Sequence, residues 1–195
     1  MKRFLLPVLI ILGSCHSHQT ETASPEIKTV DTVKKNFLPV LDYLKSEIAS
    51  VDSFPARIMK FRIEKNKTDS EIITTPVFDQ IAKVFLRQEL DSPFFEKTFE
   101  ENSFVDRTSN LTSFTYLTRD SGYGLKRVDV LTTPTPGGNN KLSSIYLEVS
   151  SGNKDTLTMS KMSWKAGSNF RILQIQKPAN GDEITKQLIV DWGGE

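Results

Sequence analysis

The sequence predicts an α+β domain in which N-terminal helices pack on one face of a twisted antiparallel meander of about six strands. Before about residue 100, apolar residues mostly recur at steps of three and four, which is the spacing of one face of a helix. After Phe104, strand-like segments alternate with short turn clusters. Short connections favour antiparallel neighbours, and helices followed by strands favour the α+β class.

Three helices are expected. The first runs from Val30 to about Ser50, where apolar residues form one stripe, but Pro39 lies inside it. An interior proline costs about 3 kcal/mol, so we expect a kink or a restart near Asn36. A second helix should begin at Thr75-Pro76 and a short third one at Ser92-Pro93, because proline is favoured in the first turn of a helix.

The strands are predicted from alternation and from turn residues. Met59, Phe61 and Ile63 alternate with polar residues, which predicts a half-buried strand. The basic stripe on its other side is expected to be solvated: Lys60, Arg62, Lys65 and Lys67. The later strands are expected at residues 111–118, 125–133, 141–150, 155–164, 169–177 and 183–192, separated by clusters such as PTPGGNN and PANGD.

Aromatic residues gather in the second half of the helical region. Six of the twelve phenylalanines fall between Phe78 and Phe104. They could form a wall for a lipid or peptide guest, but a helix face on a sheet needs such residues in any case, so we interpret them as core. Trp164 and Trp192 end their predicted strands, and we expect them to close the edge of the sheet.

The first residues of the chain predict a targeting segment. Lys2 and Arg3 precede an apolar run from Phe4 to Leu12. Nine helical residues reach roughly 14 Å, whereas the hydrocarbon core of a bilayer is about 30 Å thick. A charged start, a short apolar centre and small residues at the exit are typical of a secretory signal peptide.

The exit of this segment, Leu12-Gly13-Ser14-Cys15, resembles the bacterial lipobox. The resemblance implies that Cys15 receives a diacylglyceryl group on sulfur and that the signal is cut before it. The predicted organisation is a lipoprotein signal peptide over residues 1–14, a lipidated cysteine and flexible tether over 15–29, and one α+β domain over 30–195. The layout resembles the uncharacterised envelope lipoproteins common in Bacteroidota. This resemblance implies no particular activity. The alternative is a plain secretory signal with Cys15 incidental.

The rest of the chain lacks the side chains most often used in catalysis and metal binding. No histidine or cysteine follows His18, which removes the usual members of serine and cysteine catalysis and the commonest zinc and haem ligands. His16 and His18 are interpreted as part of the tether rather than as a metal site. Glu96, Glu100 and Glu101 are interpreted as a solvated helix face rather than a catalytic pair. We predict no catalytic, cofactor-binding or metal-binding residue.

The expected function is that of a membrane-anchored, non-catalytic domain for binding or assembly. With 25 basic and 24 acidic residues, the chain has no basic field for nucleic acid, so the expected partners are the membrane, through Cys15, and an envelope protein. The alternative is a carrier that holds a lipid or other apolar ligand between helices and a curved sheet, which resembles the lipoprotein-localisation carriers in layout only. An enzyme that uses carboxylates alone is a third hypothesis.

Localisation and modification rest on the same resemblance. It implies a lipid-anchored protein of the cell envelope, on the periplasmic face of the outer membrane. Asp31-Thr32-Val33 and Asp155-Thr156-Leu157 match the Asp-Ser/Thr-apolar acceptor that Bacteroidota glycosylate. Whether either site is modified stays open.

Overall fold

The computed structural model describes residues 37–53, 57–65, 67–135 and 140–193. These residues belong to one compact unit, Lys35–Glu195. The predicted signal peptide, Cys15 and the predicted tether lie outside the described residues.

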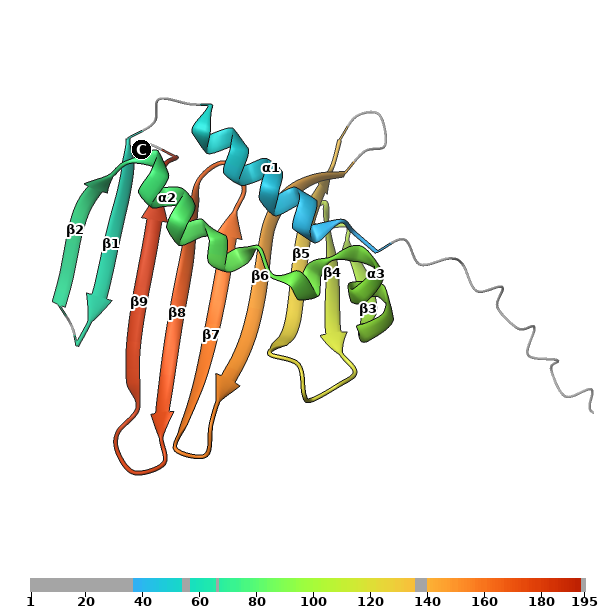
Figure 1. The fold of residues 1–195 in the computed structure, drawn as a ribbon. Helices are drawn as coiled ribbons and strands as arrows, with labels where there is room; N and C mark the ends of the chain where they lie inside the picture. Colours follow the sequence, from blue (N-terminus) through green and yellow to red (C-terminus); the bar gives the residue numbers. More distant parts are fainter. Residues whose placement is uncertain (1–36, 54–56, 66, 136–139, 194–195) are drawn as a thin grey trace, which may run out of the picture. The chain divides into compact units, whose positions relative to one another are not determined.

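One antiparallel sheet of nine strands dominates the structure, in the order β2-β1-β9-β8-β7-β6-β5-β4-β3 (Figure 1). Of the described residues, 54% lie in strands and 23% in helices. The predicted α+β domain with about six strands is therefore wrong. The strands are β1 (Ile58–Glu64), β2 (Lys67–Ile73), β3 (Phe99–Asp106), β4 (Leu111–Thr118), β5 (Leu125–Pro134), β6 (Asn140–Gly152), β7 (Thr156–Lys165), β8 (Asn169–Pro178) and β9 (Ile184–Asp191).

The two strands that the sequence did not predict form the two edges of the sheet. β2 exposes six of its seven residues, and most of β3 is exposed too, so neither shows the alternation of a half-buried strand. β1 was predicted, but its neighbour was not: it pairs with β9, and Phe61 lies opposite Ile189. Nothing local in the sequence specifies a pairing across that distance.

The six strands predicted after residue 110 are found at the expected places. β4 has the predicted bounds, and the ends of the other five lie within two residues of those predicted. Each strand from β3 to β8 pairs antiparallel with the next one along the chain. Short hairpin connections therefore build this part of the sheet as one meander.

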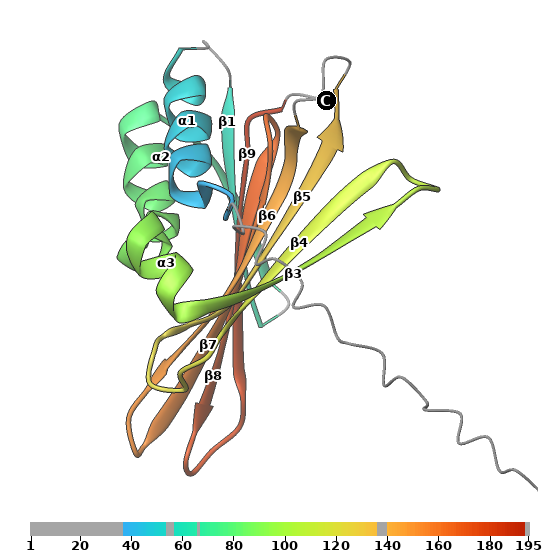
Figure 2. The same cartoon turned by 90° about the vertical axis from the view of Figure 1, so that its right-hand side faces the viewer.

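All the helices of the described part lie on one face of the sheet (Figure 2). They are α1 (Val40–Asp52), α2 (Thr75–Ala82), the short 3₁₀ helices η1 (Lys83–Phe85) and η2 (Gln88–Leu90), and α3 (Ser92–Thr98). α2 and α3 begin where predicted, each with a proline in its first turn. α1 begins directly after Pro39; a kink or restart was expected near Asn36, and residues 30–36 of the predicted helix lie outside the described residues. Among the described residues, no helix is long and apolar enough to cross a membrane.

Aromatic rings join α2 and η1 to the centre of the sheet. Phe78 and Phe85 are fully buried against Trp164, and the ring centroids of Phe85 and Trp164 lie 5.2 Å apart. Phe170 stacks on Trp164 at 5.2 Å, and Trp192 meets Phe78 edge-on at 5.1 Å. β7 is the middle strand of the sheet, so Trp164 anchors the core, and its predicted place at an edge is wrong.

A second aromatic group lies under α3. Phe95 contacts Tyr116 at 4.8 Å and Phe99 at 4.7 Å between ring centroids. The Tyr116 hydroxyl accepts a hydrogen bond from the backbone N–H of Leu38, at 3.2 Å, which ties the segment before α1 to β4. The predicted core role is confirmed for Phe78, Phe85, Phe95 and Phe99. It is wrong for Phe104, which is 68% exposed.

We predict that truncation of the central ring contact destabilises the fold. Phe78→Ala should lower the free energy of unfolding by about 3–5 kcal/mol, because it removes a fully buried ring and leaves a cavity. Urea unfolding followed by tryptophan fluorescence measures this loss. Leu157→Ala is the matched control: this β7 side chain is 46% exposed, so its loss should stay within about 0.5 kcal/mol. Equal losses in both variants would contradict the assignment of the core.

Candidate functional site

The face of the sheet opposite the helices is not covered by any described element, and we call it the open face (Figure 2). Side chains alternate between the two faces along a strand, so the strand register identifies its members. One row crosses seven strands from β4 to β1: Thr115, Asp129, Tyr146, Ser163, Arg171, Ile189 and Phe61. The next row is Leu117, Arg127, Glu148, Lys161, Leu173, Gln187 and Ile63.

β1 turns its apolar row toward the open face. Lys60 lies opposite Val190, which is fully buried, so Lys60 points to the helix side and is only 6% exposed. Its ammonium forms an ion pair with Glu71 of β2. The prediction that Lys60 lies on a solvated side is therefore wrong. Phe61, on the other side of β1, is half-buried although no helix covers it.

The rows end in an apolar region over β1, β9, β8 and β7. Its members keep part of their surface accessible because only neighbouring side chains shield them: Phe61, Ile63, Ile189, Leu173, Ile175 and Met159. In an antiparallel sheet with one solvated face, the outward side chains are commonly polar. An accessible apolar region on such a face is typical of an interaction surface.

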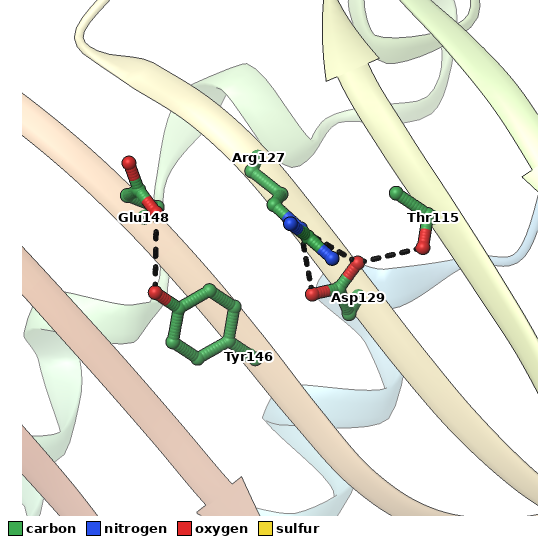
Figure 3. Close-up of polar contacts among 5 residues, drawn as sticks. All are labelled: Thr115, Arg127, Asp129, Tyr146 and Glu148. Atoms are coloured by element: carbon green, nitrogen blue, oxygen red, sulfur yellow. Dashed lines mark hydrogen bonds and ion pairs between the residues drawn. The ribbon is translucent and has the colours of Figure 1, made fainter.

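The opposite part of the open face carries a polar cluster, defined as Thr115, Arg127, Asp129, Tyr146 and Glu148 (Figure 3). The Arg127 Nε donates to both carboxylate oxygens of Asp129, at 3.0 and 2.8 Å. The Thr115 hydroxyl donates to the same carboxylate at 2.8 Å. The Tyr146 hydroxyl donates to Glu148 at 3.2 Å. In each contact an N–H or O–H donor meets a carboxylate acceptor, so these hydrogen bonds fix the positions of the charged groups in the cluster.

The protonation states fit these contacts. Partial burial, and then the negative charge of Glu148, raise the pKa of Tyr146 to about 12. Tyr146 is therefore a neutral donor near pH 7. The hydrogen bonds and charge of Asp129 raise the pKa of Arg127, which stays a cation. The cluster thus presents fixed donors and charges, and its phenol is not an activated nucleophile.

Between the apolar region and the polar cluster lies a basic triad: Lys161, Lys165 and Arg171. Lys161 and Lys165 flank Ser163 on β7, and Arg171 of β8 lies directly opposite Ser163. All three cations are exposed. Within the part of the chain that the structure describes, no ion pair joins them to a carboxylate. Lys161 lies opposite Glu148 of the polar cluster, and with Lys165 and Arg171 it presents exposed cations that favour anionic groups.

The three glutamates that the sequence places on one solvated helix face lie on two different elements. Glu96 lies on α3, whereas Glu100 lies on β3 and pairs with Arg119 at 3.0 Å, so the expected shared helix face is wrong. Glu101 points to the other side of β3 from Glu100. The acceptor pattern at Asp155-Thr156-Leu157 lies at the start of β7, and its modification stays a prediction. Across the described ranges, no group of His, Cys, Asp and Glu side chains could hold a metal ion.

The open face was not predicted from the sequence, although part of its pattern is present there. Arg127 and Asp129 stand two apart inside a predicted strand, which places them on one face. Tyr146 and Glu148 show the same spacing on the next strand. What the sequence could not supply was the register that sets the two pairs side by side.

No protein-family model, curated protein or solved structure matches the chain.

We predict that Glu148 contributes to the pKa of Tyr146. Glu148→Gln should lower this pKa below about 12, because it removes the negative charge beside the phenol, but keep it above the ordinary 10.0, because the burial remains. Ultraviolet titration of phenolate formation measures it, with Tyr146→Phe identifying the Tyr146 signal.

The raised pKa of Tyr146 also makes the free energy of unfolding fall at high pH. Since the folded pKa is raised, the contribution of Tyr146 is complete below pH 10.0 and is lost as pH rises through about 12. Tyr146→Phe should lack this loss. An unchanged pKa in Glu148→Gln would contradict the contact.

Proposed function

We propose that the protein is a membrane-anchored envelope lipoprotein whose sheet domain binds a partner protein, without catalysis, through the open face. One observation carries the binding part of this proposal. An uncovered face of the sheet presents an apolar region, a basic triad and a polar cluster across consecutive strands. A face intended only for solvent needs no such apolar region.

The chemistry of the face indicates the kind of partner. The apolar region around Phe61 and Ile189 offers area to bury, which is the main source of free energy in association. Lys161 and Arg171, at its border, favour acidic side chains on the partner and disfavour basic ones. A protein surface with apolar residues beside a cluster of Asp or Glu fits both features.

The predicted lipid anchor indicates where in the cell this binding takes place. The lipobox ending in Cys15 implies a lipidated amino terminus, and two or more acyl chains hold a protein stably on a bilayer. The chain would then be a lipid-anchored protein on the periplasmic face of the outer membrane, and its partner another envelope protein. Restriction to one membrane surface raises the effective concentration of both.

The contacts of the polar cluster favour binding over catalysis. Arg127 and Thr115 already engage the Asp129 carboxylate, and Tyr146 engages Glu148. General base catalysis needs a carboxylate or imidazole within reach of a substrate proton and with a matched pKa. The Asp129 carboxylate is engaged in an ion pair with Arg127, which fits a positioning role better.

The carrier hypothesis has less support. A guest between helices and sheet would have to replace the ring contacts of Phe78, Phe85, Trp164 and Phe170, which fill that layer in the described part. Native mass spectrometry of the purified protein distinguishes the two functions. A retained lipid would favour the carrier, and an empty domain would favour the binding domain.

We predict that Cys15 carries the anchor. In cells fed an alkyne-tagged fatty acid, the wild-type protein should take up label, and Cys15→Ala should lose it because the acceptor sulfur is gone. Ser14→Ala is the control, since it keeps the thiol and a small residue before it. Equal labelling of Cys15→Ala and wild type would exclude the anchor.

We predict that the open face contacts a partner in cells. A photo-crosslinking amino acid at Ser163, inside the basic triad, should yield a discrete adduct with an envelope protein. The same group at Ser46, an exposed position of α1, should not. Lys161→Glu together with Arg171→Glu should reduce the Ser163 adduct several-fold, because like charges would then face the partner. Adducts of equal yield from both positions, or an adduct insensitive to charge reversal, would contradict the proposal.

A further inference from the structure

The outer half of β3 is an exposed strand edge. β3 is the last strand of the sheet, and its residues from Asn102 to Val105 are all exposed. Phe104 is 68% exposed and Val105 is 60% exposed, on opposite faces of the strand. Figure 2 shows the β3–β4 hairpin projecting from the body of the sheet, away from the helices.

The other edge of the sheet is protected differently. β2 carries a charge at every second position from Lys67 through Asp69 to Glu71. Charged side chains on an edge strand oppose its pairing with another strand. β3 has no charged residue between Glu101 and Asp106, so this stretch lacks the same protection.

The backbone of β3 has a defined phase. Directly before β3 and after β4, the Arg119 N–H donates to the Thr98 carbonyl at 3.0 Å, so the adjoining pair Phe99–Thr118 is a non-hydrogen-bonded one. Because such pairs alternate along an antiparallel ladder without a bulge, even-numbered β3 residues direct their backbone groups to β4. Ser103 and Val105 therefore direct their N–H and C=O groups outward, where the described part offers no strand.

We propose that this edge pairs with β3 of a second copy of the chain, antiparallel and centred on Phe104. Phe104 then lies opposite its own counterpart in a non-hydrogen-bonded pair, where side chains come closest. Ser103 lies opposite Val105 of the second copy, and the two exchange hydrogen bonds. Asn102 lies opposite Asp106. The two sheets join into one, with their open faces on the same side.

The exposed ring of Phe104 and the charges near it together select this register among those that keep the faces aligned. Centring on Asn102 places Phe104 opposite Glu100, which leaves the exposed ring without an apolar partner. Centring on Ser103 places Asp106 opposite Glu100, which sets like charges side by side. Only the Phe104-centred register pairs the two rings and opposes no like charges. It also leaves Phe99, and with it α3, outside the paired segment.

The paired segment is short, so the dimer is weak. Contacts well below about 1,000 Å² support only transient association. Chains held on one membrane surface meet at a raised effective concentration, which favours a weak dimer. The proposal itself does not depend on the anchor or on a partner at the open face.

Disulfide trapping tests the register. In full-length Cys15→Ala chain, Phe104→Cys should form a disulfide-linked dimer under mild oxidation, because Cα atoms in a non-hydrogen-bonded pair lie about 4.5 Å apart, within disulfide range. Asn102→Cys should not, because its two copies would be separated by about four residues, or roughly 13 Å. Trapping of Asn102→Cys instead of Phe104→Cys, or of both equally, would overturn the register.

Sedimentation velocity on the Cys15→Ala chain tests the dimer itself. The weight-average sedimentation coefficient should rise with protein concentration, and Phe104→Glu should weaken the dimer at least about tenfold by placing two like charges face to face. Ile72→Glu is the matched control, since Ile72 is 60% exposed on the other edge strand. A chain that stays monomeric at millimolar concentration, or equal effects of both variants, would overturn the proposal. Neither result would affect the adducts expected at Ser163.

Discussion

Packing of aromatic side chains on only one face of the sheet is the constraint on which the rest of the structure depends. Phe78 and Phe85 come from one continuous helical segment, and Trp164 and Phe170 come from neighbouring central strands. Their mutual contacts hold α2 and η1 against the middle of the sheet. A sheet buries one face when helices cover it, and the other face is left for water or for a partner. Everything distinctive about the open face follows from this asymmetry.

The two faces of the sheet use their residues differently. On the helix side, even a lysine is enclosed: Lys60 is held by Glu71 among buried apolar neighbours. On the open side, Phe61 and Ile189 stay accessible beside exposed cations such as Arg171. Burial of a charge costs free energy unless it is paired, whereas accessible apolar area is stabilised by a partner that covers it. One face of the sheet is therefore buried by the protein's own helices, and the other face is stabilised when a partner covers it.

The sequence supports prediction where local pattern decides the structure. The bounds of β4 and the starts of α2 and α3 follow from turn clusters and from prolines at Pro76 and Pro93. The edge strands were not predicted, because an exposed strand such as β2 shows no alternation of buried and exposed residues. For β1, the strand itself was predicted correctly, but the orientation of its faces was not. Which side of β1 faces the helices depends on its register with β9, which no local pattern encodes.

The candidate site shows the same division. The spacing of Arg127 and Asp129, or of Tyr146 and Glu148, predicts that each pair shares a face. Their assembly into one polar cluster needs the pairing of β5 with β6, including its register shift next to Arg127. The basic triad likewise depends on Arg171 lying opposite Ser163 across a hairpin. Such sites arise from strand pairing, so a single sequence contains their members but not their geometry.

The pairing of β1 with β9 also has a consequence for how the molecule is made. Of the described strands, β9 comes last in the sequence, and β1 lies between β9 and β2 in the sheet. The first hairpin therefore has no place in the sheet until the final strand has left the ribosome. Local hairpins from β3 onward can form early, but joining the two ends closes the longest loop in the fold, a slow step. A chain with this order of events cannot complete its sheet until β9 has been synthesised.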